Sequence, residues 1–312
     1  MTQSPAIRPF RFGVLAGRAA DVAQWEALCR RCEEYGYGSF LVPDHLNREW
    51  GPLVALALAA RVTRSIALGP LMLGAALRQP SVVYKELATL DLVAPGRLEI
   101  GVGAGWLASD FSRAGVDMEP GPARLRQTVE AVTVLRRLWD EGSATFLGSS
   151  HQVLDAVGEP RPSPARWTMG GGGPGMLRAA AELADIVSFS ARLSSGSKDS
   201  SFGPSARAAE FDRRVRWVLE AGPVGDPPEF QCLLFAAAIC ASSTRYAERV
   251  LTHMFGLPPT EALDSPLALA GSVDEVCERL EERRKRYGIS YWVLPAAQAD
   301  AFAPVVARLA GK

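Results

Sequence analysis

Two adjacent residues with ionisable side chains, Asp44 and His45, follow a short apolar stretch at residues 39–42. A carboxylate beside an imidazole can accept and donate protons near neutral pH. The chain has three histidines, and His45 alone stands at the end of a predicted strand. An ordinary turn is the competing interpretation, because Pro43-Asp44 is common turn chemistry. We take Asp44 and His45 as candidate catalytic residues.

A run of four glycines, Gly170, Gly171, Gly172 and Gly173, precedes Pro174. Proline favours the first turn of a helix, so the run predicts a loop that opens a helix. Free backbone N–H groups at a helix N-terminus attract a phosphate group. A purely structural loop is the alternative, although four glycines lose much backbone freedom on folding. The run therefore predicts a phosphate-binding site.

Two further segments could approach a ligand through their backbone. Residues 101–106 read Gly-Val-Gly-Ala-Gly-Trp, but they match no phosphate fingerprint, because the later helix-opening glycine and the downstream acid are missing. Residues 68–75 read Leu-Gly-Pro-Leu-Met-Leu-Gly-Ala, and a Gly-Pro inside a strand favours a bulge. A flat ring could lie over such a bulge, and a strand with irregular ends is equally compatible with these residues.

Short apolar segments alternate with helical patterns along the chain, which indicates an α/β fold. Eight parallel strands joined by helical crossovers close best as a (β/α)8 TIM barrel, whose active site lies at the carboxyl ends of the strands. We predict one barrel domain over residues 1–312, with an open doubly wound sheet as the alternative. Residues 141–166, between the fourth and fifth strands, are predicted as an insertion with little regular structure, and residues 190–205 as a mobile lid or a substrate-facing loop. The predicted strands span residues 10–15, 39–42, 66–73, 97–102, 167–169, 185–189, 230–239 and 289–294.

The composition argues against several classes of function. Hydrophobic residues make up 48% and charged residues 22% of the chain, and 34 basic residues balance 34 acidic ones. Without a basic stripe, neither nucleic acid nor a membrane surface is an expected partner. The N-terminus lacks a signal-peptide pattern and the longest apolar run, residues 52–60, is too short to span a bilayer, so we expect a cytoplasmic protein. Cys29 and Cys32 have no second Cys or His pair nearby, so we expect no metal site.

In combination, these motifs resemble the luciferase-like monooxygenase superfamily, and more closely its branch of coenzyme F420-dependent oxidoreductases. The joint order and spacing of the motifs over residues 10–190 carry the resemblance, and beyond residue 205 it is mostly architectural. The motifs are Pro43-Asp44-His45, Arg78-Gln79-Pro80, residues 85–91, residues 96–106, the glycine run with Pro174, and Ala184-Asp185-Ile186-Val187.

The resemblance implies a luciferase-like (β/α)8 barrel, usually a homodimer, with the ring of coenzyme F420 over the third strand and FMN as the alternative cofactor. It implies a non-proline cis peptide at Leu71–Met72, with Asp44 beside the ring. His45 and Trp106 would line the substrate side, and the glycine run would hold the phosphate. The implied cofactor contacts are Asp44, Leu71, Met72, Gly74, Gly103, Ala104, Gly105, Gly170, Gly171, Gly172 and Gly173.

Two departures from the family bear on the substrate. Some sugar-phosphate-oxidising relatives place a glutamate where Trp106 stands, and the usually aliphatic strand before the glycine run begins Arg166-Trp167-Thr168. The resemblance implies an F420-dependent reductase that acts on a C=C or C=N bond of a small-molecule or peptide substrate. Asp44, His45 and Trp106 are its implied catalytic residues, and His45 either donates a proton or only packs against the ring. An FMN-dependent monooxygenase and a non-catalytic partner barrel are the alternatives.

Overall fold

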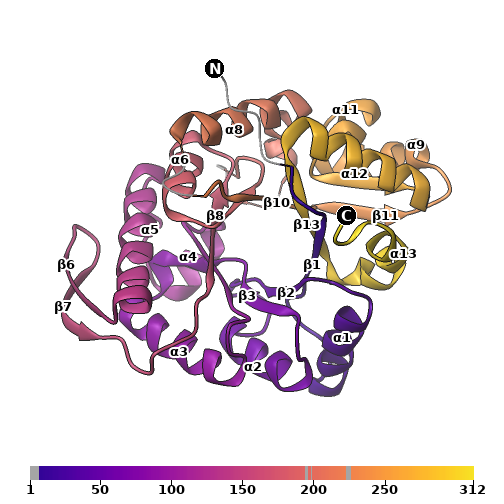
Figure 1. Cartoon of the computed structure of the whole chain (residues 1–312). Coiled ribbons are helices and arrows are strands. Elements are labelled where there is room, and N and C mark those ends of the chain that lie inside the picture. The colour runs from indigo at the N-terminus through magenta and orange to yellow at the C-terminus, as the bar shows by residue number, and fades with distance from the viewer. Residues whose placement is uncertain (1–6, 194–195, 198, 223–225) are drawn as a thin grey trace. The chain divides into compact units, whose positions relative to one another are not determined.

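The computed structural model describes residues 7–193, 196–197, 199–222 and 226–312 (Figure 1). The chain gathers into two compact units. We call residues 16–31 and 40–168 the N-terminal unit, and residues 1–15, 32–39 and 169–312 the C-terminal unit. Each unit buries its own set of aliphatic and aromatic side chains.

Prolines mark the helix starts of the N-terminal unit. Pro52, Pro80 and Pro122 stand in the first turns of three helices, where the missing N–H would have no intrahelical acceptor. The first elements of the chain after β1 (Arg11–Leu15) are α1 (Val22–Glu34) and β2 (Ser39–Val42). The elements that follow are α2 (Pro52–Val62), β3 (Ala67–Pro70), β4 (Leu73–Gly74), α3 (Pro80–Val93), β5 (Glu99–Gly103), α4 (Ala108–Ala114) and α5 (Gly121–Arg136).

The third predicted strand is interrupted at Leu71 and Met72. A cis peptide bond joins these two residues between β3 and β4, as the resemblance implied. β4 pairs in parallel with β5, and Gly74 stands opposite Gly103. At Gly69, an added Cβ would lie 1.6 Å from a backbone oxygen of β5. The close approach of β3 and β5 therefore requires glycine at position 69.

The insertion after α5 is ordered, so the prediction of little regular structure there was wrong. The helix continues through a π-helical turn, Arg137–Glu141. The chain then forms an antiparallel hairpin of β6 (Ser143–Leu147) and β7 (Gln152–Val157), which extends beside α5 in Figure 1. The position of the insertion, between the fourth and fifth strands of the barrel, was predicted correctly.

A single carboxylate on α5 holds the turn of this hairpin. Glu130 accepts hydrogen bonds from the backbone N–H groups of Ser149, Ser150 and His151 at 3.0, 2.8 and 2.9 Å. Burial opposes the ionisation of Glu130, but the hydrogen bonds together outweigh it and lower the pKa of this carboxyl group to about 2. The hairpin is thus fastened by a contact that its own residues do not reveal.

Parallel ladders join the strands of the C-terminal unit. β13 pairs with β1 and with β10, and β10 pairs with β9. The elements up to β10 are β1 (Arg11–Leu15), β8 (Arg166–Gly171), which ends in this unit, α6 (Pro174–Leu183), β9 (Ile186–Phe189), α7 (Gly203–Ala206), α8 (Ala208–Ala221) and β10 (Glu229–Leu233). The later elements are β11 (Ala236–Ile239), α9 (Ser243–Tyr246), α10 (Thr252–Phe255), α11 (Pro259–Asp264), β12 (Ala268–Gly271), α12 (Val273–Tyr287), β13 (Ile289–Pro295) and α13 (Ala299–Leu309).

The segment 230–239 forms two strands, so the prediction of one strand was wrong. After β10 the chain changes its partner: the N–H of Leu234 donates to the carbonyl of Val293 at 2.8 Å, and the N–H of Phe235 donates to the carbonyl of Leu267 at 2.8 Å. β11 then pairs with β12 in a separate two-stranded sheet. The largely apolar sequence of residues 230–239 does not show where one partner strand replaces the other, because the residues are mostly buried in both pairings.

The parallel strands follow the hydrogen-bonded order β3-β2-β1-β13-β10-β9-β8-β5-β4. Since β3 and β4 are the two parts of one interrupted strand, the order returns to the strand where it began, with eight strands in chain sequence. This is the strand order of a (β/α)8 barrel, so the predicted fold class is confirmed.

Two of the smaller predictions meet the limits of the described residues. In the predicted loop 190–205, a short helical turn, Ser200–Phe202, precedes α7, and residues 194, 195 and 198 lie outside the described residues. Within the part of the chain that the structure describes, every helix is too short or too polar to cross a membrane.

Candidate active site

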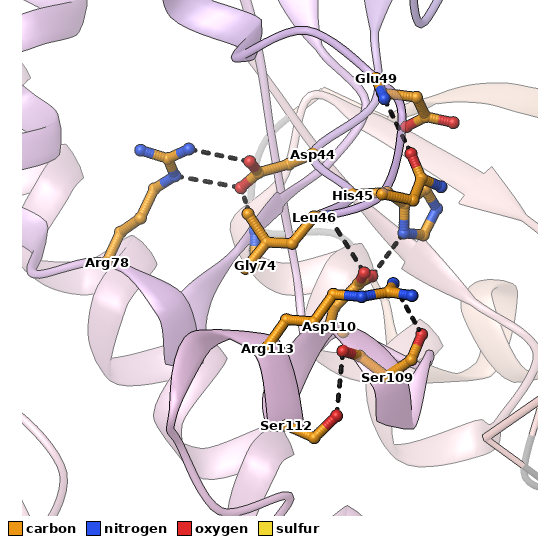
Figure 2. A network of polar contacts seen from close by, with 12 residues as sticks. Asp44, His45, Leu46, Glu49, Gly74, Arg78, Ser109, Asp110, Ser112 and Arg113 are labelled. Atoms are coloured by element: carbon orange, nitrogen blue, oxygen red, sulfur yellow. Dashed lines mark hydrogen bonds and ion pairs between the residues drawn. The ribbon is translucent and has the colours of Figure 1, made fainter.

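Asp44 lies just beyond β2 and is held by an arginine and a backbone amide (Figure 2). The guanidinium of Arg78 donates from Nη2 to Oδ1 at 2.8 Å and from Nε to Oδ2 at 3.0 Å, and the N–H of Gly74 donates to Oδ2 at 3.2 Å. The hydrogen bond to Asp44 raises the pKa of Arg78. Because both carboxylate oxygens already accept hydrogen bonds, the geometry favours a positioning role for Asp44 over proton transfer.

His45 points away from Asp44 and meets a second carboxylate, Asp110 (Figure 2). Nδ1 of His45 lies 2.6 Å from Oδ2 of Asp110, and the N–H of Leu46 donates to the other carboxylate oxygen at 3.0 Å. Asp110 is buried in the first turn of α4. A proton on Nδ1 shared with Asp110 leaves Nε2 as the nitrogen that can exchange a proton with a substrate.

Sequence reasoning missed Asp110 because it missed α4. No element was predicted between Trp106 and residue 121, although Asp110 in the first turn of a short helix is favourable for the helix dipole. Asp110 follows Trp106, a predicted site residue, by four positions. This nearness in the chain is the signal in the sequence that could have pointed to Asp110.

Trp106 contacts the imidazole of His45 from the side. The two rings meet edge to face, with centroids 5.7 Å apart and an interplanar angle of 89°. Trp106 is half-buried, so part of its indole remains exposed. The structure therefore brings together the two residues that were predicted to line the substrate side, and their roles stay predictions.

The exit from β5 is held by an arginine that sequence reasoning also missed. Arg124 of α5 donates to the carbonyl of Gly105 and, at 3.5 Å, to that of Ala104. Gly105 has a φ of +68°, a conformation that favours glycine. Burial lowers the pKa of Arg124. This arginine therefore fixes the backbone that carries Trp106.

Several of the predicted cofactor contacts of the N-terminal unit lie on or beside the paired strands β4 and β5. The pairing sets Gly74 opposite Gly103, and Met72 packs against Gly103, where an added Cβ would lie 3.3 Å from the Met72 sulfur. Leu71 is tied to β2, because its N–H donates to the carbonyl of Val42 at 2.8 Å. Gly74 and Gly103 have no side chains, so nothing projects from these two positions of the strand pair.

The glycine run of the C-terminal unit divides into two kinds of position. A Cβ added to Gly170 would lie 1.9 Å from the carbonyl oxygen of Ser188, and one added to Gly172 would lie 2.4 Å from the carbonyl carbon of Ala191. Close packing therefore requires glycine at these two positions. Gly173 has open space around it and is the N-cap of α6, which has no side-chain cap. The first N–H groups of a helix have no intrahelical acceptor, so the N-terminus of α6 can offer such groups to an anion.

The family follows from a comparison over most of the chain. Residues 7–290 match the model of the family described as luciferase-like monooxygenase. The chain belongs to this family. The family that was inferred from the sequence motifs is thereby confirmed.

Two curated relatives show how the family members differ. The chain is 31% identical to an F420-dependent glucose-6-phosphate dehydrogenase of Kineococcus radiotolerans over 179 residues, which cover 54% of this chain and 51% of that protein. It is 32% identical to 4-hydroxyprotoasukamycin monooxygenase of Streptomyces nodosus subsp. asukaensis over 130 residues, covering 40% and 33% of the two chains. The matched part thus spans about half the length of the dehydrogenase and a third of the monooxygenase.

A solved structure shares the fold over nearly the whole length. The coenzyme F420-dependent tetrahydromethanopterin reductase from Methanopyrus kandleri superposes with a TM-score of 0.75 at 20% identity, over 98% of this chain and 99% of that one. At this identity the likeness concerns the fold, which agrees with the strand order found here.

Proposed function

We propose that this protein is a coenzyme F420-dependent oxidoreductase that acts as a reductase on a C=C or C=N bond of a small or medium-sized organic substrate. The observation that carries the proposal is the 2.6 Å contact of His45 with Asp110 in a member of the luciferase-like family. The similarity to F420-dependent glucose-6-phosphate dehydrogenases supports the choice of cofactor.

The residues of each unit fit a part of this cofactor. In the N-terminal unit, Gly74 and Gly103 carry no side chains, Met72 packs against Gly103, and the N–H of Gly74 bonds to Asp44. This arrangement suits a flat tricyclic ring. In the C-terminal unit, the uncapped N-terminus of α6 at Gly173 suits a phosphate group. When bound, coenzyme F420 supplies a two-electron hydride carrier.

The protein would supply the proton that accompanies the hydride. A proton on Nε2 of His45 can pass to a substrate atom, while Asp110 holds the imidazole through Nδ1. The backbone N–H of Leu46 fixes the second oxygen of Asp110, so the carboxylate keeps its orientation toward His45. Asp44 is occupied by Arg78 and leaves acid–base chemistry to His45.

Trp106 supports the proposed substrate class. An indole stands where some sugar-phosphate-oxidising relatives have a glutamate, and it offers an apolar edge to a substrate near His45. A site of this kind favours an unsaturated, largely apolar molecule over a sugar phosphate. Glucose 6-phosphate is therefore not the expected substrate, although relatives of similar sequence carry that name.

Titration of the purified protein with coenzyme F420, followed by cofactor fluorescence, tests the proposal. Saturable quenching in the micromolar range, with FMN binding at least tenfold more weakly, is the expected result. Tight FMN binding without F420 quenching would instead establish the second candidate, an FMN-dependent monooxygenase. The 32% identity to 4-hydroxyprotoasukamycin monooxygenase is the observation that favours this candidate.

We also propose that the protein is a homodimer, on the evidence of exposed apolar side chains on two adjacent helices. Val54 of α2 is 71% exposed, and Val82 and Leu92 of α3 are 56% and 63% exposed. Exposed large apolar side chains on neighbouring helices are residues that a protein interface can bury. Light scattering at micromolar concentration should give twice the 33.4 kDa mass of one chain, and a single-chain mass would reject the dimer.

A further inference from the structure

Arg214 of α8 is a fully buried arginine that lies against the glycine run. Its side chain has 0% exposure, and its Nε donates to the carbonyl of Gly172 at 3.2 Å. Its Nη2 donates to the carbonyl of Ser205 at 2.7 Å. Nη1 is buried and has no hydrogen-bond partner among the described residues. The guanidinium therefore joins the glycine run to the segment that ends before α8.

No carboxylate among the described residues contacts Arg214, and its guanidinium carbon lies 4.7 Å from the centroid of the Phe211 ring. Both of its acceptors are neutral backbone carbonyls, and the acidic residue one turn away, Glu210, pairs with Arg213 at 3.1 Å. Burial lowers the pKa of Arg214 to about 10, so the group is still a cation at neutral pH. A buried cation without an anion costs free energy that a nearby negative ligand can offset.

A second arginine stands beside the same loop. The backbone N–H of Arg192 lies 2.5 Å from the point where a Cβ of Gly172 would be, and its side chain is exposed. The same N–H donates to Oγ of Ser205 at 2.9 Å, so Arg192 and Arg214 are linked through one serine. The proximity of the Arg192 cation also lowers the pKa of Arg214. Two arginines thus flank Gly172, the residue before the N-cap of α6.

We propose that Arg214 is the positioning residue of an anion site at Gly172 and Gly173, and that its buried charge, which no carboxylate among the described residues contacts, acts through the glycine run on the phosphate group of the bound cofactor. Arg192 supplies a second positive charge at the open side of the same site. The inference rests on the proposed function, since it takes the glycine run as the phosphate loop. It explains how a loop of glycine and proline, which has no side chain to offer, attracts a phosphate.

Two substitutions of Arg214 separate its charge from its hydrogen bonds. Neither Arg214→Lys nor Arg214→Gln can span both carbonyls as a guanidinium does, but only lysine keeps the positive charge. The measured quantity is the ratio of dissociation constants between a cofactor without its phosphate and the intact cofactor. It is measured for the deazaflavin pair and for riboflavin against FMN, so the test does not depend on which cofactor the protein uses.

We expect Arg214→Gln to lower this ratio about tenfold or more, equivalent to about 1.4 kcal/mol, and Arg214→Lys to keep most of it. Arg283→Gln is the matched control, because Arg283 is also buried and also donates to backbone carbonyls, those of Ala268, Ser265 and Leu263. The control should lower the melting temperature and leave the ratio unchanged.

Equal ratios for the lysine and glutamine variants would overturn the proposal, as would an equal loss in the Arg283 control. If the glutamine variant does not fold, the result for Arg214→Lys decides. A ratio of dissociation constants that is about tenfold lower in folded Arg214→Lys than in wild type would then reject the proposal. Binding of FMN in place of F420 would reject the proposed function but leave the ratio test intact. A wild-type ratio near one with both cofactor pairs would reject the anion site itself.

Discussion

Nδ1 of His45 lies 2.6 Å from Oδ2 of Asp110, although 65 positions separate the two residues in the chain. One residue follows β2 and the other lies in the first turn of α4. Through this contact the buried carboxylate of Asp110 sets the tautomer of His45. It also gives the proton-transfer hypothesis a second residue that can be changed without touching the imidazole.

Asp110→Asn should lower turnover by about 10²-fold while cofactor affinity stays within threefold of wild type. The amide keeps the size of the carboxylate but does not stabilise an imidazolium. Steady-state kinetics and cofactor titration check both numbers. Asp117→Asn, in the exposed stretch after α4, is the control and should behave like wild type. Equal activity of the two variants would show that Asp110 only shapes the loop.

His45→Gln should have the larger effect, a loss of about 10²–10⁴-fold in turnover. Glutamine retains hydrogen bonding to Asp110 but cannot donate a proton as an acid. If His45 and Asp110 act as one unit, the double variant should be no slower than His45→Gln alone. A variant of His45 within threefold of wild type would leave only packing for this residue.

The hairpin of β6 and β7 should loosen in acid, because its anchor is an ionised carboxyl group. The pKa of Glu130 is lowered from its ordinary value of 4.5 to about 2, so its contribution to stability is complete above pH 4.5 and is lost as the pH falls toward 2. Urea unfolding between pH 5 and 2 should show this loss in wild type. Glu130→Gln should be less stable at pH 5, and the difference should shrink toward pH 2. A constant difference across that range would contradict the anchor.

Local sequence rules predicted most of the barrel because local chemistry determines those parts. Pro52, Pro80 and Pro174 stand in the first helical turns, as expected from their fixed backbone. The apolar stretch at residues 39–42 was predicted with the bounds that the structure has. These elements need no distant partner to be recognised.

The features that could not be predicted depend on distant partners. The hairpin of the insertion is fastened by Glu130 on α5, and Gly and Pro residues around it hid its two short strands. Asp110 is meaningful only through His45, and Arg124 only through the carbonyl of Gly105. One sequence does not show which remote side chain will meet a given loop.

The glycine run can be tested at two neighbouring positions with opposite expectations. Gly172→Ala should destabilise the fold by about 1–3 kcal/mol, because its Cβ would lie 2.4 Å from the backbone of Ala191. Gly173→Ala has open space and should leave the melting temperature nearly unchanged. Thermal unfolding of both variants, with cofactor affinity measured for the alanine variant at 173, checks this. Equal destabilisation at the two positions would contradict the packing described here.

Arg78→Met should weaken both stability and cofactor binding, because it leaves the carboxylate of Asp44 buried without its cation. The side chain of Asp44 is 3% exposed and that of Arg78 is 28% exposed, so this pair is more protected from water than a surface ion pair. Removal of one partner from a fully buried pair costs about 3–5 kcal/mol, and the partial exposure of Arg78 places the expected loss nearer 2 kcal/mol. Arg30→Met is the control, since the exposed pair of Arg30 with Glu26 on α1 should contribute less than about 0.5 kcal/mol.

The same variant reports on the site. If Asp44 lies beside the cofactor ring, a carboxylate released from Arg78 will shift, and cofactor affinity should fall about tenfold or more. Arg78→Lys keeps the charge but not the two parallel hydrogen bonds, so it should recover stability more than affinity. Chemical denaturation of Arg78→Met, Arg78→Lys and Arg30→Met gives the stability, and cofactor titration of the same variants gives the affinity. A loss of stability with unchanged affinity in Arg78→Met would make the Asp44–Arg78 pair a structural contact and move the ring site elsewhere on the β4–β5 surface.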